Sequence, residues 1–435
     1  MSMRKISLLI TGAVALASGA VASAQTTAIM DGRVITVSGD VIEGGDVIIS
    51  NGRITQVGAD LSAPSGATVI DATGKVVTPG IIAPYSTIGL EEIGLDAEAN
   101  DASPAREIGF PLGAALDAID AYNPSSILIP INRAGGVTRA LSTPEAGDSI
   151  FGGQAALIDL SGDVDSVMQP RVAQVAMLGF SGAARAGDTR MGAWAFIREY
   201  FDEARSYASN PNDYVRRSRD PRFSLSDLKA LGPVVSGAQT VIISANSAND
   251  IRNVIRLKNR YRLKVVIVGG SEAWRVAEDL RNADISVILD PLFNLPAQFE
   301  DLDATFANAG RLHDAGVTIG LYNPQGFAAH NLRTLTQQAG NAVANGLSYE
   351  GAMAALTLGP ATMLGVDAQL GSIEAGKIAD VVVWDGDPLE VTTQPEAVFI
   401  NGVAQSLENR QTMLRDRYRD LSRGDLPHAY RGATK

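Results

Sequence analysis

The sequence predicts an α/β protein that combines a (β/α)8 TIM barrel with a small composite β-sandwich built from the N- and C-terminal segments. Two observations lead to this prediction. Eight apolar runs in the middle of the chain alternate with stretches of helical periodicity, and hairpin signals occur near both ends. With 435 residues and a hydrophobic content of 46%, the chain is long enough to bury one large core and a smaller one.

The eight apolar runs are short enough to be buried strands. They cover residues 81–85, 137–141, 155–160, 172–178, 241–244, 265–268, 285–289 and 318–321. Several are followed by apolar residues at helical spacing, such as Ile251, Val254 and Ile255. Continuous apolar strands alternating with amphipathic helices indicate a parallel sheet, and eight such units favour a barrel. The competing doubly wound sheet favours a G-x-G-x-x-G turn, which this sequence lacks.

Each end of the chain carries a hairpin signal. Asn51-Gly52 separates two β-branched runs near the N-terminus, and Asn401-Gly402 does so near the C-terminus. Neither segment has enough strands for a stable sheet alone, so we expect the two to combine beside the barrel. The expected division is 1–24 as a signal peptide, 25–78 as the first part of the β-sandwich, 79–366 as the barrel, 367–408 as the second part of the β-sandwich, and 409–435 as a charged tail.

The first 24 residues have the parts of a secretory signal peptide. Arg4 and Lys5 form a basic start, residues 6–17 are largely apolar, and Ala22-Ser23-Ala24 supplies small residues for cleavage. The apolar run is too short for a lasting membrane span, and no later segment reaches about 18 uninterrupted apolar residues. We therefore expect cleavage after Ala24 and a periplasmic or secreted protein that is free of the membrane afterwards.

Charge and cysteine content narrow the choice of partners. The formal charge of −12 becomes −14 when Arg4 and Lys5 leave with the signal peptide, because that segment contains no acid. A net acidic surface repels phosphate backbones, so no nucleic-acid partner is expected. The sequence has no cysteine, which excludes disulfides and thiolate metal ligands.

Three stretches of the sequence match a known pattern. The first combines Asn51-Gly52-Arg53-Ile54 with residues 70–80, the second covers residues 245–270, and the third covers residues 370–389. Together they resemble the amidohydrolase superfamily, and the second is similar to its imidazolonepropionase-like branch. The resemblance implies a metal-bearing TIM barrel joined to a β-sandwich. It also implies hydrolysis of C–N bonds in amides, cyclic amides and amino acid derivatives, other than linear peptide bonds.

The resemblance further implies a site for zinc or another divalent metal at the C-terminal mouth of the barrel, but the usual ligands are replaced. The family pattern Pro-Gly-Phe-Ile-Asp-x-His-x-His puts Ala83, Tyr85 and Thr87 where an acid and two histidines are expected. Ser244 replaces a histidine on the fifth strand, and Asn323 lies where the eighth strand should supply an aspartate. Neutral hydroxyls are poor metal ligands, since tyrosine ionises only near pH ~10. We therefore expect no cofactor and regard Tyr85, Thr87, Ser244 and Asn323 as pocket candidates.

Arg139 and His330 are two further pocket candidates. Arg139 lies in the second strand, where it could bind a ligand carboxylate or form a buried ion pair, and the sequence leaves both open. His330 follows the eighth strand and could overhang the mouth, although a polar first turn of the next helix is the favoured explanation. The two other histidines, His313 and His428, fall on no expected ligand position.

Two functions remain open from the sequence. The first is a divergent or inactive amidohydrolase that keeps the family framework with a degenerate metal site. The second is a non-catalytic protein that binds a small molecule, or that partners an active homologue in the same compartment. A homo-oligomer is compatible with either function.

Overall fold

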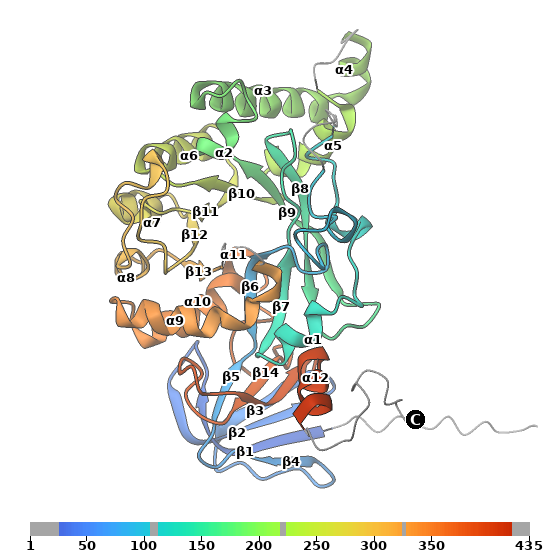
Figure 1. Ribbon diagram of the computed structural model, residues 1–435, viewed down its shortest axis with the longest axis vertical. Helices are drawn as coiled ribbons and strands as arrows, with labels where there is room; N and C mark the ends of the chain where they lie inside the picture. Colours follow the sequence, from blue (N-terminus) through green and yellow to red (C-terminus); the bar gives the residue numbers. More distant parts are fainter. Residues whose placement is uncertain (1–25, 105–111, 218–222, 324–327, 420–435) are drawn as a thin grey trace, which may run out of the picture.

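The computed structural model describes residues 26–104, 112–217, 223–323 and 328–419. The predicted signal peptide, 1–24, and residues 420–435 of the predicted tail lie outside this range. Within it, the chain forms a barrel and a separate small sheet that lies below the barrel in Figure 1. None of the helices in the described residues is long and apolar enough to cross a membrane.

The barrel consists of eight strands, hydrogen-bonded in chain order from β13 back to β6 in the described residues. They are β6 (Ile81–Ser86), β7 (Val137–Ser142), β8 (Phe151–Asp159), β9 (Val167–Met177), β10 (Thr240–Ala245), β11 (Lys264–Gly269), β12 (Ser286–Leu289) and β13 (Ile319–Leu321). Each of the eight predicted runs overlaps one of these strands. The barrel is nearly closed, because β13 packs against β6: a Cβ atom on Gly320 would lie 3.2 Å from Cγ of Pro84.

One strand departs from the predicted parallel arrangement. β8 pairs antiparallel with both of its neighbours, β7 and β9, whereas the other neighbouring pairs of the barrel are parallel. The connections are residues 143–150 and 160–166. A parallel crossover needs roughly a dozen residues or more, so these short links allow only a hairpin-like return.

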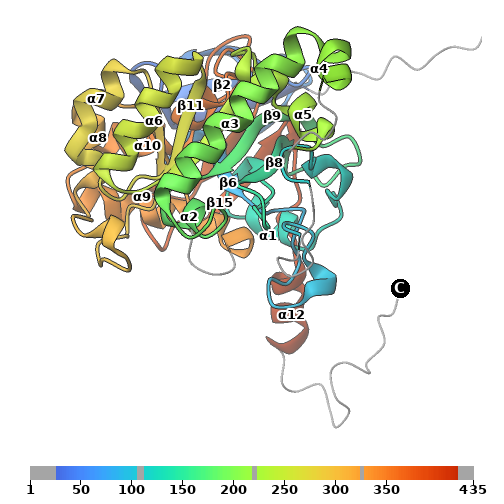
Figure 2. The same cartoon turned by 90° about the horizontal axis from the view of Figure 1, so that it is seen from above.

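The helices pack around the barrel and at its two ends. They are α1 (Leu128–Arg133), α2 (Gly179–Ala183), α3 (Arg190–Ser209), α4 (Pro211–Arg217), α5 (Leu225–Val235), α6 (Ala248–Tyr261), α7 (Ala277–Asn282), α8 (Asn308–Asp314), α9 (Leu335–Ala344), α10 (Tyr349–Leu356), α11 (Leu358–Met363) and α12 (Arg410–Arg419). Figure 1 shows α6, α7 and α8 outside β10 to β13, and Figure 2 shows α3 beside α6. Short 3₁₀ helices, among them η5 (Phe299–Asp301) and η6 (Ala328–His330), lie in the connections.

Both faces of the barrel strands are buried, which explains their continuous apolar sequences. On β11, Val265 and Ile267 pack in the cluster between strands and helices, while Val266 and Val268 pack in the cluster inside the barrel. Alternate residues of a strand point to opposite faces, so a strand buried on both sides needs apolar residues at every position.

The small sheet joins the two ends of the chain, as the sequence predicts. Its strands are β1 (Thr26–Ile35), β2 (Val41–Ser50), β3 (Arg53–Ala59), β4 (Thr68–Asp71), β5 (Val76–Pro79), β14 (Val381–Trp384), β15 (Pro395–Ile400) and β16 (Val403–Ala404). They form one mixed sheet, in which β5 pairs with β14 and thereby connects the N-terminal strands to the C-terminal ones. The hairpin between β2 and β3 turns at Asn51 and Gly52, with φ of 53° and 77°.

Candidate functional site

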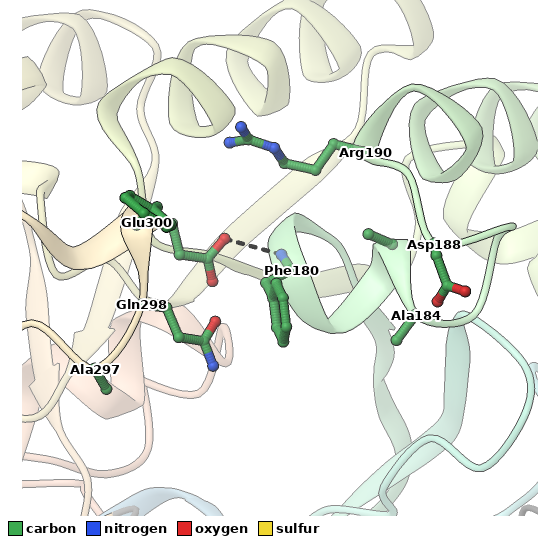
Figure 3. A pocket seen from close by; sticks show the side chains of 9 residues that line it. Phe180, Ala184, Asp188, Arg190, Ala297, Gln298 and Glu300 are labelled. Atoms are coloured by element: carbon green, nitrogen blue, oxygen red, sulfur yellow. Dashed lines mark hydrogen bonds between the residues drawn. The ribbon is translucent and has the colours of Figure 1, made fainter.

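Two adjoining cavities lie at the C-terminal ends of the barrel strands. What we call the inner cavity has a volume of about 230 Å³ and is lined by Ser181, Asn246, Gly269, Ser271, Asp290, Phe293, Ala297, Gln298, Glu300, Asp301 and Tyr322. The outer cavity, drawn in Figure 3, has a volume of about 520 Å³ and is lined by Phe180, Ala183, Ala184, Asp188, Arg190, Ala297, Gln298, Phe299 and Glu300. Three residues after β12, Ala297, Gln298 and Glu300, belong to both cavities.

Glu300 connects the walls of the two cavities. Its Oε2 accepts a hydrogen bond from the backbone N–H of Phe180 in α2 (2.8 Å, Figure 3), and its Oε1 accepts one from the side-chain amide of Asn246 after β10 (3.0 Å). Burial raises the pKa of Glu300, although these two hydrogen bonds oppose the shift. The loop after β12 is thereby fastened to the ends of β9 and β10.

Asp301 fastens the same loop on its other side. Its carboxylate accepts a hydrogen bond of 2.7 Å from the hydroxyl of Ser271, which follows β11. Asp301 is almost fully buried, and burial raises the pKa of its carboxyl. The two adjacent acids therefore hold the mouth together through donors from three different strand ends.

Asp290 is the least satisfied carboxyl of the inner cavity. It follows β12 directly and is 8% exposed. Its Oδ1 accepts the backbone N–H of Leu292 at 2.9 Å, whereas its buried Oδ2 has no hydrogen-bond partner among the described residues. Burial raises the pKa of the Asp290 carboxyl. Because buried polar atoms are nearly always paired, this oxygen is a candidate for contact with a ligand.

Two tyrosines occupy the upper part of the barrel interior. Tyr85 of β6 and Tyr322, which follows β13, meet edge to face with their ring centroids 5.8 Å apart. Burial raises the pKa of both phenols far above the ordinary value of 10.0, and the carboxylates of Asp290 and Asp301 raise that of Tyr322 further. Both side chains are therefore neutral at physiological pH.

Thr87 and Ser244 make contacts within the protein near the strand ends. The pairing of β6 with β7 shifts register between Ala83 and Ser86, which places Ala83 in the outer cluster while Tyr85 packs on the inner one. Thr87, beyond this shift, donates a hydrogen bond of 2.8 Å to Glu91. The hydroxyl of Ser244 accepts the backbone N–H of Leu178 at 3.3 Å, tying β9 to β10.

Asn323 and His330 follow β13 and line neither cavity, and η6, which carries His330, contacts α1. The Asn323 amide lies 3.5 Å from the hydroxyl of Thr334, to which it donates. His330 ends η6 and is half-buried. Neither side chain belongs to the lining of the inner or the outer cavity.

Arg139 lies away from the mouth, in a buried ion-pair network beside the small sheet. Its guanidinium donates to both carboxylate oxygens of Asp380 (2.6 and 3.1 Å) and to the side chain of Asn401 (2.6 Å). A third partner, Asp159, lies at 3.4 Å. Of the two roles that the sequence leaves open for Arg139, the contacts are those of the buried ion pair.

Comparisons with known proteins agree with this architecture. Residues 249–414 match the model of the amidohydrolase family. The structure superposes on an amidohydrolase from Thermotoga maritima with a TM-score of 0.77 and 28% identity, covering 87% of this chain and 99% of that one. The chain resembles the amidohydrolase family in sequence and in fold.

Two curated proteins of this kind are similar in sequence. Amidohydrolase tasK of Hapsidospora irregularis is 27% identical over 382 residues, which is 79% of this chain and 37% of that protein. Imidazolonepropionase of Symbiobacterium thermophilum is 35% identical over 85 residues, or 19% of this chain and 20% of that protein. The chain therefore spans well under half the length of either relative.

The amidohydrolase framework raises the question of whether the mouth could hold a metal ion. Tyr85, Thr87 and Ser244 offer neutral oxygens, and no three histidine, aspartate or glutamate side chains in the described residues are gathered so as to hold a metal. Of the three acids of the inner cavity, Glu300 and Asp301 are already engaged by protein donors. The donor set does not fit a divalent cation, and no reaction step is derived through one.

The acids of the mouth were not predicted from the sequence. Asp290 follows an apolar strand immediately, and a polar residue at the C-terminal end of a barrel strand is a signal for a site. That signal was available for Asp290. Glu300 and Asp301 lie ten and eleven residues after Asp290, and no spacing in the sequence places them against Phe180 or Ser271.

Proposed function

We propose that the protein binds a small organic molecule at the barrel mouth without a resident divalent metal. The observation that carries the proposal is the Tyr85–Tyr322 pair, which puts two neutral phenols at the ends of the first and eighth barrel strands. The cavity beside Tyr322 is enclosed by residues from five strand ends and is large enough for a small ligand. Such a site can recognise a ligand by hydrogen bonding and shape.

We further propose that this binding takes place outside the cytoplasm, as the predicted signal peptide suggests. The protein would act there as a ligand-binding pseudoenzyme, alone, as a homo-oligomer or beside an active homologue. The acidic composition supports a small molecule or a protein as the partner over a nucleic acid.

A second function is favoured by Asp290. A carboxyl whose pKa is raised keeps its proton to higher pH than usual, and such a group can donate that proton to the leaving nitrogen of an amide. Metal-independent hydrolysis of a C–N bond would use Asp290 in this way. Turnover of cyclic dipeptides or N-acyl amino acids by metal-free protein, lost in Asp290→Asn, would favour this second function.

Elemental analysis and ligand screening of the mature protein test the first proposal. Protein produced in zinc-supplemented medium should contain much less than one metal ion per chain and should melt at the same temperature with and without a chelator. A small-molecule panel should contain compounds that raise the melting temperature. One tightly bound metal per chain together with metal-dependent hydrolysis would overturn the proposal.

A further inference from the structure

The charged side chains that line the inner cavity are all acidic. Three of its lining residues, Asp290, Glu300 and Asp301, are acids, and the described lining contains no lysine, arginine or histidine. Glu300 and Asp301 are each paired with protein donors, so Asp290 is the member with bonding capacity left. An anionic ligand group in this cavity would meet three carboxyls and no cation, which disfavours it.

The free oxygen of Asp290 defines what the missing partner must be. Oδ2 is buried, and the Asp290 residue as a whole is more than nine-tenths buried. A carboxylate can only accept hydrogen bonds, so the group that completes it must carry N–H or O–H. A charged N–H donor satisfies both the hydrogen bond and the charge, and charge-assisted bonds of this kind are roughly twice as strong as neutral ones.

Aromatic rings in the same lining favour an organic cation. Tyr322 and Phe293 both line the inner cavity, and cationic nitrogen groups are attracted to the faces of such rings. A bare metal ion would need several oxygen ligands, and the described residues do not gather three acids or histidines in a suitable arrangement. The lining therefore suits an ammonium group better than a metal ion.

The adjoining outer cavity suits an apolar body. Phe180, Ala183, Ala184 and Phe299 contribute apolar surface there, and the ring of Phe180 projects beside Glu300 and Gln298 in Figure 3. Because the two cavities share Ala297, Gln298 and Glu300, one ligand can extend from one into the other. The two linings together match a molecule with a cationic end and an apolar or aromatic end.

We infer that the barrel mouth binds a small hydrophobic primary amine, whose ammonium group donates to Oδ2 of Asp290 in the inner cavity while its apolar part lies in the outer cavity. This inference rests on the proposed ligand-binding function and specifies its ligand class. The recognition is one of charge and hydrogen bonding at Asp290, flanked by the acids of η5.

Calorimetric titration with three probes of similar shape tests the inference. They are 2-phenylethylamine, its neutral analogue 2-phenylethanol and the anion phenylacetate. At neutral pH the amine should bind wild-type protein at least about tenfold more tightly than the alcohol, the equivalent of ~1.4 kcal/mol. Equal affinities for amine and alcohol, or no binding of the amine by metal-free protein, would overturn the inference.

Two variants locate the effect. Asp290→Asn should abolish the preference for the amine, whereas Asp314→Asn should preserve it. Asp314 is an exposed acid at the end of α8 and lines neither cavity. Its variant therefore makes the same change of charge without altering the site. A preference that survives Asp290→Asn would contradict the assignment.

Binding of all three probes without preference would overturn the inference but leave ligand binding at the mouth intact. Stoichiometric metal with hydrolysis would overturn the proposed function itself.

Discussion

Asp380 and Asp290 are both more than nine-tenths buried, at 6% and 8% exposed, yet their carboxylates differ in how many hydrogen bonds they accept. Asp380 receives two hydrogen bonds from Arg139 and one from the backbone of Asn401. Asp290 receives one backbone hydrogen bond, and its second oxygen has no partner among the described residues. The first lies where the barrel meets the small sheet, and the second lies at the mouth.

The difference separates a structural centre from a binding centre. A buried ion pair that is fully hydrogen-bonded fixes the elements that carry it, here β7 and the start of β14. A buried carboxyl left incomplete costs free energy in the empty protein, and it persists where a ligand completes it. Folding free energy should therefore fall most when the first centre is broken, and ligand affinity should fall most when the second is changed.

Arg139→Met should give the largest loss of stability. It leaves the carboxylates of Asp159 and Asp380 buried without their cation, and breaking a buried pair from one side typically costs about 3–5 kcal/mol. Urea unfolding followed by circular dichroism measures the change. Arg252→Met is the matched control, because the Arg252–Asp279 pair is half exposed and should contribute about 1 kcal/mol or less. Similar losses in the two variants would contradict the structural role of Arg139.

Gly179→Ala should cause the next largest loss and should act on the mouth. Gly179 has a φ of +62°, and an added Cβ would lie 2.8 Å from Oε2 of Glu300, the atom bound to Phe180. Backbone strain and the disturbed hydrogen bond together should cost about 2–3 kcal/mol. Gly365→Ala isolates the strain, since Gly365 has a φ of +69° with no atom near the added Cβ, and it should cost about 1 kcal/mol. Equal losses would show that Glu300 moves aside freely.

The strands could be predicted from sequence because their signals are local. Val265 to Val268 are apolar at every position, since both faces of β11 are covered, and Asn51-Gly52 sets its hairpin through two positive φ angles. The direction of β8 was not predicted, because an apolar run looks the same in a parallel and an antiparallel strand. Only the short connections on either side reveal it.

The site was harder to predict because its contacts are distant in sequence. Glu300 meets Phe180 across 120 residues, and Arg139 meets Asp380 across 241. Strand alternation puts residues i and i+2 on one face, but the register shift of β6 beyond Ala83 leaves Ala83 and Tyr85 in different clusters. A single-strand pattern contains neither kind of information. Asp290 is the exception, since its place directly after an apolar strand is visible in the sequence.

Asp290→Asn should change stability in the opposite direction from Arg139→Met. Burial raises the pKa of Asp290 above its ordinary value of 3.8, so between the two pKa values the folded protein holds a proton that the unfolded chain has lost. The unfolding free energy that Asp290 contributes is then greatest below pH 3.8 and falls as the pH rises through the raised pKa. At pH 7 the uncharged variant should be more stable than wild type, by on the order of 1 kcal/mol.

The pH dependence identifies the cause of that gain. The difference between Asp290→Asn and wild type should shrink toward acid pH, where Asp290 is protonated and resembles the amide. Urea unfolding at several pH values measures it, with Asp314→Asn as the exposed control. A difference that is constant with pH would mean that packing, and not the buried charge, distinguishes the variant.

Ser244→Ala should have the smallest effect and sharpens the boundary of the site. The Ser244 hydroxyl accepts the N–H of Leu178 at 3.3 Å and lines neither cavity, so its removal should cost only about 0.5–1 kcal/mol. Binding of 2-phenylethylamine should stay within about twofold of wild type, which titration calorimetry resolves. Ser244 occupies a position where the family resemblance implies a metal ligand. A large loss of binding with little loss of stability would therefore mean that the ligand contacts β10 and not only Asp290. Unchanged binding would place recognition with the acids after β12 and leave Ser244 as a link between two strands.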